Sequence, residues 1–421
     1  MTRRTWFRWH SWIGLTTGLL LFVVCWSGTV AVFSREIDLV LDPAHSAAPR
    51  TESIAWGAFE RSIAAEHPDW WLFQMTASHG PGTTLEAWAM DEQDVTWRID
   101  GDPATGAIVQ TRTLFGVQRF FRSFHMALFV EDWPILGVPL GDWIVALLSV
   151  PLLASMVTSL VFYRRFWRGF LRLEWRKGRK VFWSDAHKLA GLWSLWFILA
   201  IGLTGLWYLA ERHLAPGPEP PQAEASKDPM RLPVGELVAR AQAAYPELVI
   251  NAVILRDVDR GLFEVHGQDG AALVRDRAAR VWLDARSGTV LGVQRSARLS
   301  PYERWIETAD PVHFGNFAGL WSKVPWFVFG LALSGLCLSG AYLQAKRQER
   351  RDEGAYRGPI VAAYAATIAC LLLAAAFGYR EIMSYGSAGA PPAVPAGVTA
   401  FIAAWTAATL GILTLWMRWV R

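Results

Sequence analysis

The sequence predicts an α-helical polytopic membrane protein with six transmembrane helices and two α+β domains outside the membrane. Three observations lead to this prediction. Of the 421 residues, 52% are hydrophobic and only 19% are charged, which excludes a disordered or collagen-like chain. Six apolar runs have about the 20 residues that a helix needs to cross a bilayer. Two long polar segments between these runs are large enough to fold as small domains.

The predicted elements alternate along the chain. In order they are the first helix (1–33), the first outside domain (34–134), the second helix (135–163), a basic loop (164–188), the third helix (189–210), the second outside domain (211–318), the fourth helix (319–344), and the fifth and sixth helices (345–421).

The basic residues decide the predicted orientation. Arg3, Arg4 and Arg8 precede the first helix, and nine Lys or Arg stand in the loop 164–188. Further basic residues lie between the fifth helix and its predecessor, and at the C-terminus. If the chain crosses the membrane six times, all these segments lie on the same side, as the positive-inside rule expects of the cytoplasmic face. We therefore predict that both termini lie on the cytoplasmic side of the membrane and both long polar segments on the opposite side. The net charge of +4 is the remainder of a charge separation across that membrane and does not indicate nucleic-acid binding.

An internal repeat relates residues of about 1–165 to residues of about 178–345. The shared pattern is H-x3-G-x12-[ST]-G, which comprises His10, Gly14, Ser27 and Gly28 in the first copy and His187, Gly191, Thr204 and Gly205 in the second. The outside segments also correspond. Trp97–Asp100 with Thr105-Gly106 resembles Trp282–Asp284 with Ser287-Gly288, and each predicts a strand, a turn with Gly at positive φ, and a returning strand.

Each outside segment ends with a histidine before the next membrane helix, His125 in the first copy and His313 in the second. Because the copies have the same orientation, a pseudo-two-fold axis along the membrane normal should relate them. That axis would bring His10 opposite His187 near the cytoplasmic face, and His125 opposite His313 near the outer face. Neutral imidazole is a good axial ligand for haem iron. The sequence therefore predicts two bis-histidine haem sites, one above the other.

Small and basic residues flank these histidines. Gly14 and Gly191 follow the inner histidines by one helical turn, on the same face, where the missing Cβ would let a flat macrocycle approach. Gly14-x3-Gly18 is also a helix-packing motif, and both interpretations can hold. Arg8 and Arg122 are candidate partners for haem propionates.

His125 is expected on an amphipathic helix at the membrane interface. The apolar side of this helix would carry four aromatic residues, Phe120, Phe121, Phe124 and Phe129. Five other histidines have no partner in the repeat. We expect His45, His67, His79 and His266 to be ordinary surface or core residues. His213, at an outer helix end, is interpreted as an interface anchor, with a reserve ligand or substrate contact as the alternative.

The cysteines and the absent motifs restrict the chemistry. Cys25, Cys337 and Cys370 lie within membrane helices, and no C-x-x-C-H occurs, so the haems must be b-type and noncovalent. The chain has no G-x-G-x-x-G, G-x-x-x-x-G-K-[ST] or H-E-x-x-H motif. A nicotinamide-binding, ATP-driven or zincin protein is therefore not predicted. The near absence of mid-membrane charges also disfavours transport.

Two motifs and the outside segments resemble a known family. They are Arg8-Trp9-His10-x3-Gly14 and Asp185-Ala186-His187-x3-Gly191, together with Leu232–Leu237, Tyr245-Pro246 and Val281–Asp284 in the second outside segment. On these residues the chain resembles the PepSY-associated transmembrane family, which includes PiuB-like proteins and inner-membrane ferrisiderophore reductases of the FoxB type. The outside segments are similar to PepSY domains, the first being more degenerate.

The resemblance implies an oxidoreductase that moves electrons across the cytoplasmic membrane through two b haems. It further implies ferric siderophore in the periplasm as the acceptor, reduced so that Fe(II) is released. The electron donor would be a cytoplasmic flavoprotein or a membrane quinol, and the loop 164–188 either docks such a flavoprotein or only sets the topology. Two alternatives are a PepSY binding or regulatory protein without redox activity, and a quinol-linked cytochrome b subunit for another periplasmic acceptor.

Overall fold

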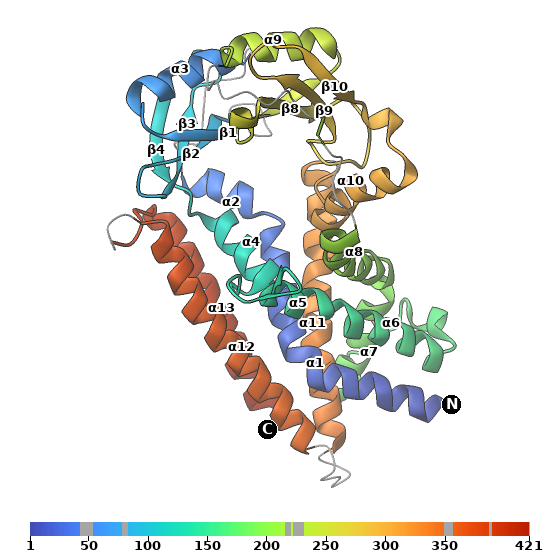
Figure 1. Ribbon diagram of the computed structural model, residues 1–421. Coiled ribbons are helices and arrows are strands. Elements are labelled where there is room, and N and C mark those ends of the chain that lie inside the picture. Colours follow the sequence, from blue (N-terminus) through green and yellow to red (C-terminus); the bar gives the residue numbers. More distant parts are fainter. Residues whose placement is uncertain are drawn as a thin grey trace.

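The computed structural model describes residues 1–42, 54–77, 83–214, 220–221, 231–348, 357–386 and 390–420. The chain forms a bundle of long helices with a β-sheet part at one end (Figure 1).

Six helical segments of the described chain are long and apolar enough to cross a membrane, as the sequence predicts. They are α1 (Arg3–Ala31), α5 with α6 (Leu140–Leu147 and Ser149–Phe162), α8 (Leu195–Leu214), α11 (Leu320–Gln348), α12 (Arg357–Ser384) and α13 (Ala396–Val420). Within the described part of the bundle, α1 packs most extensively against α11. Short 3-10 turns occur at Phe166–Gly169, Val258–Arg260 and Ser296–Arg298.

Two of the predicted membrane helices are interrupted. The second is divided at Leu148, three residues before Pro151, which has no N–H for the helical ladder and crowds the preceding turn. The third, expected at 189–210, is divided at Ser194 into α7 (Arg179–Trp193) and α8. His187 and Gly191 therefore lie on a separate helix, and the predicted loop 164–188 already contains its first turns.

All strands of the sheet run antiparallel. It has eight strands in the order β10-β9-β8-β7-β1-β2-β3-β4. The first four in the chain are β1 (Trp71–Ala77), β2 (Leu85–Met90), β3 (Thr96–Gly101) and β4 (Ile108–Thr113), and the others are β7 (Val249–Ile254), β8 (Leu262–Gln268), β9 (Ala279–Asp284) and β10 (Val290–Gln294). The predicted strand–turn–strand units are β3–β4 and β9–β10, with Gly106 and Gly288 at positive φ. A two-stranded hairpin, β5 (Pro134–Ile135) and β6 (Val138–Pro139), precedes α5.

The two predicted outside domains are joined into one sheet. Strand β1 pairs with β7, so that Gln74, Met75 and Thr76 stand opposite residues 254, 253 and 252. Both halves also share one hydrophobic core, in which Met75 and Val265 are fully buried. The expectation of two separate domains at 34–134 and 211–318 is therefore corrected to two half-sheets with a common core.

Helices α3 (Trp56–Glu66) and α9 (Val234–Ala244) cover the face of the sheet that is turned away from the bundle (Figure 1). Phe59 of α3 and Leu237 of α9 are fully buried in the shared core. The two helices touch at Gly57 and Gly235, where a Cβ on Gly57 would lie 2.9 Å from the Cα of Gly235. This close approach needs glycine, and it packs the helix of one half-sheet directly against the helix of the other.

Three further helices connect the sheet to the bundle: α2 (Ser34–Leu41), α4 (Val117–Ala127) and α10 (Pro301–Phe314). The sequence predicts a helix around His125 at the membrane interface, and the structure corrects the environment of that helix. Phe120, Phe121 and Phe124 of α4 are buried against Trp405 of α13, at ring-centroid distances of 4.9 to 6.0 Å. Phe129 lies beyond the helix end but in the same buried cluster. Thus α12 and α13 provide a protein wall for α4 instead of lipid headgroups.

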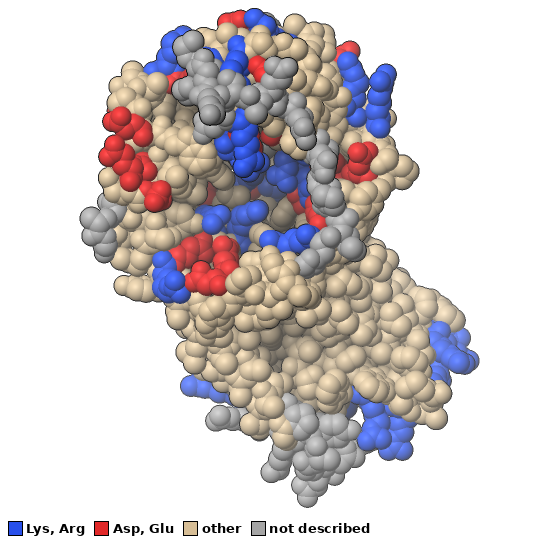
Figure 2. Space-filling view, viewed as in Figure 1, with Lys and Arg blue, Asp and Glu red and all other residues tan. Residues whose placement is uncertain are grey.

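The charged residues mark the ends of the molecule. Figure 2 shows a broad uncharged band over the helical bundle and Lys or Arg gathered at its lower end. It also shows a hollow between the sheet and the bundle, with basic and acidic side chains inside it.

Candidate functional site

The inner histidines face each other between helices from the two halves of the chain. The ring centroids of His10 on α1 and His187 on α7 are 6.4 Å apart. His10 Nδ1 lies 3.0 Å from the Ser155 carbonyl oxygen and 3.2 Å from Thr158 Oγ1, both on α6. His187 Nδ1 lies 2.9 Å from Ser339 Oγ on α11. Each inner histidine is therefore held by the second membrane helix of its own half.

The outer histidines form a second facing pair. The ring centroids of His125 on α4 and His313 on α10 are 6.2 Å apart. His125 Nδ1 lies 3.0 Å from the Val24 carbonyl oxygen and 3.2 Å from Ser27 Oγ, both on α1. His313 Nδ1 lies 2.8 Å from Thr204 Oγ1 on α8. The structure thus brings together the two pairs that the repeat predicts.

The hydrogen bonds define the same tautomer in all four rings. A carbonyl oxygen only accepts, so Nδ1 of His10 and of His125 carries the proton. The hydroxyl of Thr204 donates to the Ala200 carbonyl at 2.7 Å, so it accepts from His313. The Ser339 hydroxyl likewise donates to a backbone carbonyl of its own helix. The Nε2 lone pairs are left to bind a metal, as in metal sites whose ligating histidines donate their other N–H to a protein acceptor.

The ring separations fit one six-coordinate iron in each pair. A ligand bond of about 2 Å on each side, plus about 1 Å from each bonding nitrogen to its ring centroid, gives roughly 6 Å between centroids. Within the described residues, no group of three or more His, Cys, Asp or Glu is arranged to hold a metal ion. Two imidazoles of each pair could therefore hold a metal ion whose remaining ligands would come from elsewhere, and a tetrapyrrole cofactor such as haem would supply them.

Glycines provide room beside the inner pair. A Cβ on Gly14 would meet no atom within 4 Å, and one on Gly191 would meet only Leu336 Cδ2 at 3.8 Å. Open space therefore lies one turn beyond each inner histidine, where the sequence predicts a macrocycle. Gly18 instead packs on α11, since its Cβ would lie 3.2 Å from the Cys337 carbonyl oxygen. Within the Gly14-x3-Gly18 motif, Gly14 therefore fits the interpretation of space for a macrocycle, and Gly18 fits the interpretation of helix packing.

Other glycines support the histidine rings directly. A Cβ on Gly28 would lie 2.5 Å from His125 Cε1, and one on Gly340 would lie 3.1 Å from His187 Cε1. The [ST]-G element of the repeat therefore has a function that the sequence did not disclose. In each half the hydroxyl residue bonds the outer histidine. In the first half the glycine also makes space for that histidine, whereas Gly205 makes space for Ser149 Oγ, which would lie 2.7 Å from an added Cβ. The identical offset of the [ST]-G element from the inner histidines was the available signal.

The predicted arginines have different surroundings. Arg8 is exposed on α1, two residues before His10, a spacing that places side chains on nearly opposite sides of a helix. Arg347 at the end of α11 lies over the Phe7 ring and acts electrostatically on both inner histidines. Arg347 is not among the predicted propionate partners, because the basic residues of its segment have the pattern that sets membrane topology. Arg122 is exposed one turn before His125.

Arg122 belongs to a group of cations above the outer pair. Its electrostatic neighbours include Arg35 and Arg277, with Asp310 as the nearby anion. Although part of its side chain reaches the surface, desolvation by the surrounding protein and the like charges, Arg119 first among them, lower the pKa of Arg122 without removing its charge at neutral pH. Figure 2 shows that basic side chains gather in the hollow between the sheet and the bundle.

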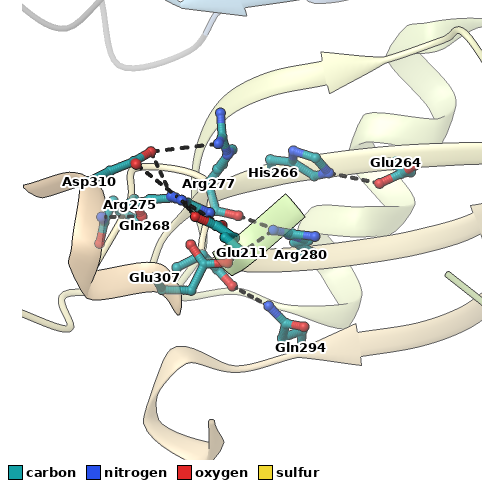
Figure 3. A network of polar contacts seen from close by, with 11 residues as sticks. Glu211, Glu264, His266, Gln268, Arg275, Arg277, Arg280, Gln294, Glu307 and Asp310 are labelled. Atoms are coloured by element: carbon teal, nitrogen blue, oxygen red, sulfur yellow. Dashed lines mark hydrogen bonds and ion pairs between the residues drawn. The ribbon is translucent and has the colours of Figure 1, made fainter. Parts of the chain in front are cut away.

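The helices that carry the outer histidines are fixed by acidic residues. The carboxylate of Asp38 on α2 accepts from the N–H groups of Val117 and Gln118 at 2.7 and 2.8 Å, which caps α4. On the other side, Asp310 of α10 bonds Arg275 from the sheet (Figure 3). The helix that carries His125 is thus tied to α2, and the helix that carries His313 is tied to the second half-sheet.

The remaining histidines lie away from these pairs. His67 stacks on Trp70 with a centroid distance of 3.8 Å. His266 is buried in β8 and bonds Glu264 at 2.8 Å. Both have the ordinary surroundings that we expect of them. His45, His79 and the side chain of His213 lie outside the described residues.

The two sites lie at different levels along α1. On α1, His10 and the Val24 carbonyl that holds His125 are fourteen residues apart, which corresponds to about 21 Å of helix. Between His187 and Thr204 the sequence offset equals that between His10 and Ser27. The pairs therefore lie at two well-separated levels of the bundle.

Comparisons with known proteins agree with the architecture. A family model described as PepSY-associated TM region matches residues 7–347. An uncharacterised protein of Pseudomonas aeruginosa is 27% identical over 335 residues, covering 70% of this chain and 80% of the relative.

Proposed function

Because the chain belongs to the PepSY-associated transmembrane family, we propose that this multi-pass membrane protein is a dihaem b oxidoreductase. It takes electrons from a cytoplasmic flavoprotein or a quinol and delivers them to a periplasmic acceptor across the bacterial inner membrane. The acceptor is a ferric siderophore, from which reduction releases Fe(II). The observation that carries the proposal is the presence of two facing histidine pairs with centroid distances of 6.4 and 6.2 Å.

The residues of the chain prepare each site for a b-type haem. When bound, the haems supply one-electron transfer. His10 and His187 would hold the inner haem, and His125 and His313 the outer one. The Nδ1 hydrogen bonds orient the rings before any cofactor arrives, and Gly14 and Gly191 leave space beside the inner pair. Arg347 is the cation that best fits the inner propionates.

The orientation and the repeat complete the proposal. The basic segments are placed in the cytoplasm and the sheet in the periplasm, so that the outer pair faces the acceptor. The two halves derive from a parallel duplication, which explains why residues at equal offsets serve equivalent histidines. Each haem would then be held by one ligand from each copy.

The hollow between sheet and bundle is the place where an acceptor would dock. Arg122 lies one turn before His125, and Arg277 pairs at 3.7 Å with Asp310, one turn before His313. An anionic chelate that enters the hollow would meet both guanidinium groups above the outer pair. Siderophore oxygens are hard ligands that favour ferric iron, so one-electron reduction weakens the complex.

The first experiment is the absorption spectrum of the purified protein, oxidised and then reduced with dithionite. We expect two low-spin b haems per chain. His10→Ala and His187→Ala should remove the same haem, and His125→Ala and His313→Ala the other, with His67→Ala as a control that removes neither. Absence of a Soret band after haem-supplemented expression would contradict the redox proposal and favour a PepSY binding or regulatory protein.

A second experiment identifies the acceptor. Right-side-out vesicles containing the protein would hold a reductant in the lumen, at the cytoplasmic face, and would be given ferric siderophore and a ferrous chelator outside to trap Fe(II). We expect trapping that is lost in His125→Ala and weakened in Arg122→Ala. Haem reduction without any trapped Fe(II) would favour a quinol-linked cytochrome b that serves another acceptor.

A further inference from the structure

A buried ion-pair network links the second half-sheet to α10. Arg275, in the loop between β8 and β9, contacts Asp310 through Nε at 2.6 Å and through Nη2 at 3.0 Å (Figure 3). The same guanidinium bonds Glu211 of α8 at 3.0 Å. The Arg275 and Asp310 side chains are only 12% and 20% exposed. A bidentate ion pair with so little solvent is strongly directional.

This network reaches His313 by two routes. Asp310 precedes His313 by three residues, so both lie on the same face of α10. Tyr208 of α8 donates its hydroxyl to Asp310 at 2.9 Å, and its ring packs against the His313 ring at a centroid distance of 5.1 Å. The carboxylate of Asp310 also acts electrostatically on His313.

The charges of the network are closely balanced. Burial alone would raise the pKa of Asp310, but the Arg275 guanidinium outweighs it and the pKa lies below its ordinary value, so the carboxylate is ionised at neutral pH. Arg280 pairs with Glu307 at 3.1 Å beside it. Removing one member of the Arg275–Asp310 pair therefore leaves one uncompensated charge near the outer histidines, in surroundings where water screens it poorly.

We propose that Asp310 and Arg275 are positioning residues that set the reduction potential of the outer haem through α10. Asp310 stabilises the ferric form and Arg275 cancels most of this effect, so that the sheet and the outer site are energetically coupled. The inference rests on the proposed function, because it requires haem between His125 and His313.

The test is a redox titration of the purified full-length protein, in which the two haems are followed by their absorption bands. Asp310→Asn should shift the potential of the outer haem upward, and Arg275→Met should shift it downward. The double variant should return close to the unmodified value, because the local charge is balanced again. Asp310→Glu retains the charge and should restore the potential. Asp269→Asn is the matched control, since this carboxylate bonds Tyr245 and Ser296 elsewhere in the same half-sheet. The inner haem should not shift in any variant.

The outcomes separate the two proposals. If the unmodified protein binds no outer haem, both the proposed function and this inference fail. If the outer haem is present but the two single variants shift it in the same direction, or the double variant shifts it furthest, the network acts only by loosening α10 and the inference is overturned. Should Asp310→Asn not fold, the Arg275 variants decide. Arg275→Met should lower the potential of the outer haem, and Arg275→Lys, which keeps the positive charge, should leave it close to the unmodified value. An unchanged or raised potential in Arg275→Met would overturn the inference.

Discussion

Replacing Gly28 by alanine should dislodge the outer histidine of the first half. The added Cβ would lie 2.5 Å from His125 Cε1 and 3.0 Å from its Nδ1, whereas carbon atoms in contact are about 3.5 Å apart. The ring must therefore move by about 1 Å or the α1–α4 contact must open, at a cost of about 1–3 kcal/mol. A ligand bond of about 2 Å does not tolerate such a displacement. Gly28→Ala should therefore convert the outer haem from the six-coordinate low-spin form to a five-coordinate high-spin form, or release it.

The assay is the haem-to-protein ratio together with the low-spin signals in the absorption and electron paramagnetic resonance spectra. Gly205→Ala is the matched comparison from the other half, because its Cβ would be 3.8 Å from His313 and would displace Ser149 instead. Gly411→Ala on α13, with no atom within 4 Å of its Cβ, controls for the substitution itself. Two unchanged low-spin haems in Gly28→Ala would refute the assignment of His125 as a ligand held against α1.

Three other predictions address the inner site, the sheet and the pH dependence of stability. Ser339→Ala removes the hydroxyl that holds His187 Nδ1, and the loss of such a supporting contact should weaken haem binding at the inner pair by roughly 10–100-fold in a haem titration; equal affinity would show that the hydroxyl does not orient the ring. Met75→Ala empties a fully buried position of the shared core and should destabilise the sheet by about 2–5 kcal/mol in chemical unfolding, with hydrogen-exchange protection lost in both halves; loss confined to β1–β4 would contradict a common core. Burial and the hydrogen bond to Asp269 raise the pKa of Tyr245 to about 12. The folded state therefore resists deprotonation, and the stabilisation is complete below pH of about 10 and is lost as the pH rises toward 12. Melting temperatures should fall over this alkaline range, and Tyr245→Phe should show a smaller fall; the same fall in both proteins would contradict the prediction.

The repeat was the strongest signal in the sequence. Single histidines at helix ends are common, but equal offsets from His10 to Ser27 and from His187 to Thr204 required one explanation for both halves. That symmetry predicted which histidines face each other, and the structure places them at similar ring distances. It did not identify the rings as haem ligands, which remains a prediction.

The surroundings of α4 show where local patterns are insufficient. The aromatic face of this helix is readable from its spacing, but the spacing does not distinguish lipid headgroups from a protein wall. Only the tertiary structure brings Trp405, far along the chain, against Phe121. The packing of the last two membrane helices against α4 could not be predicted from the sequence for the same reason.

The pairing of β1 with β7 was hidden in a similar way. Gln74 and Thr76 alternate with the buried Met75, a pattern that fits an edge strand as well as a central one. Which edge it meets depends on the other half-sheet. The break at Ser194 was also unpredictable, because neither proline nor glycine stands at that position.

The distance between the two histidine levels has an energetic consequence. About 21 Å of α1 between His10 and Val24 corresponds to at most about seven tenths of a 30 Å hydrocarbon layer, because α1 is bent and part of its length runs across the bundle (Figure 1). In the predicted orientation, an electron that moves between these levels crosses the same fraction of the membrane voltage. Each full charge crossing is worth about 2.3 kcal/mol per 100 mV, so this step gains at most about 1.6 kcal/mol per 100 mV when the cytoplasm is negative. The membrane voltage would then drive electrons outward. In an energised cell, an acceptor whose reduction potential is too low for the donor alone could therefore be reduced.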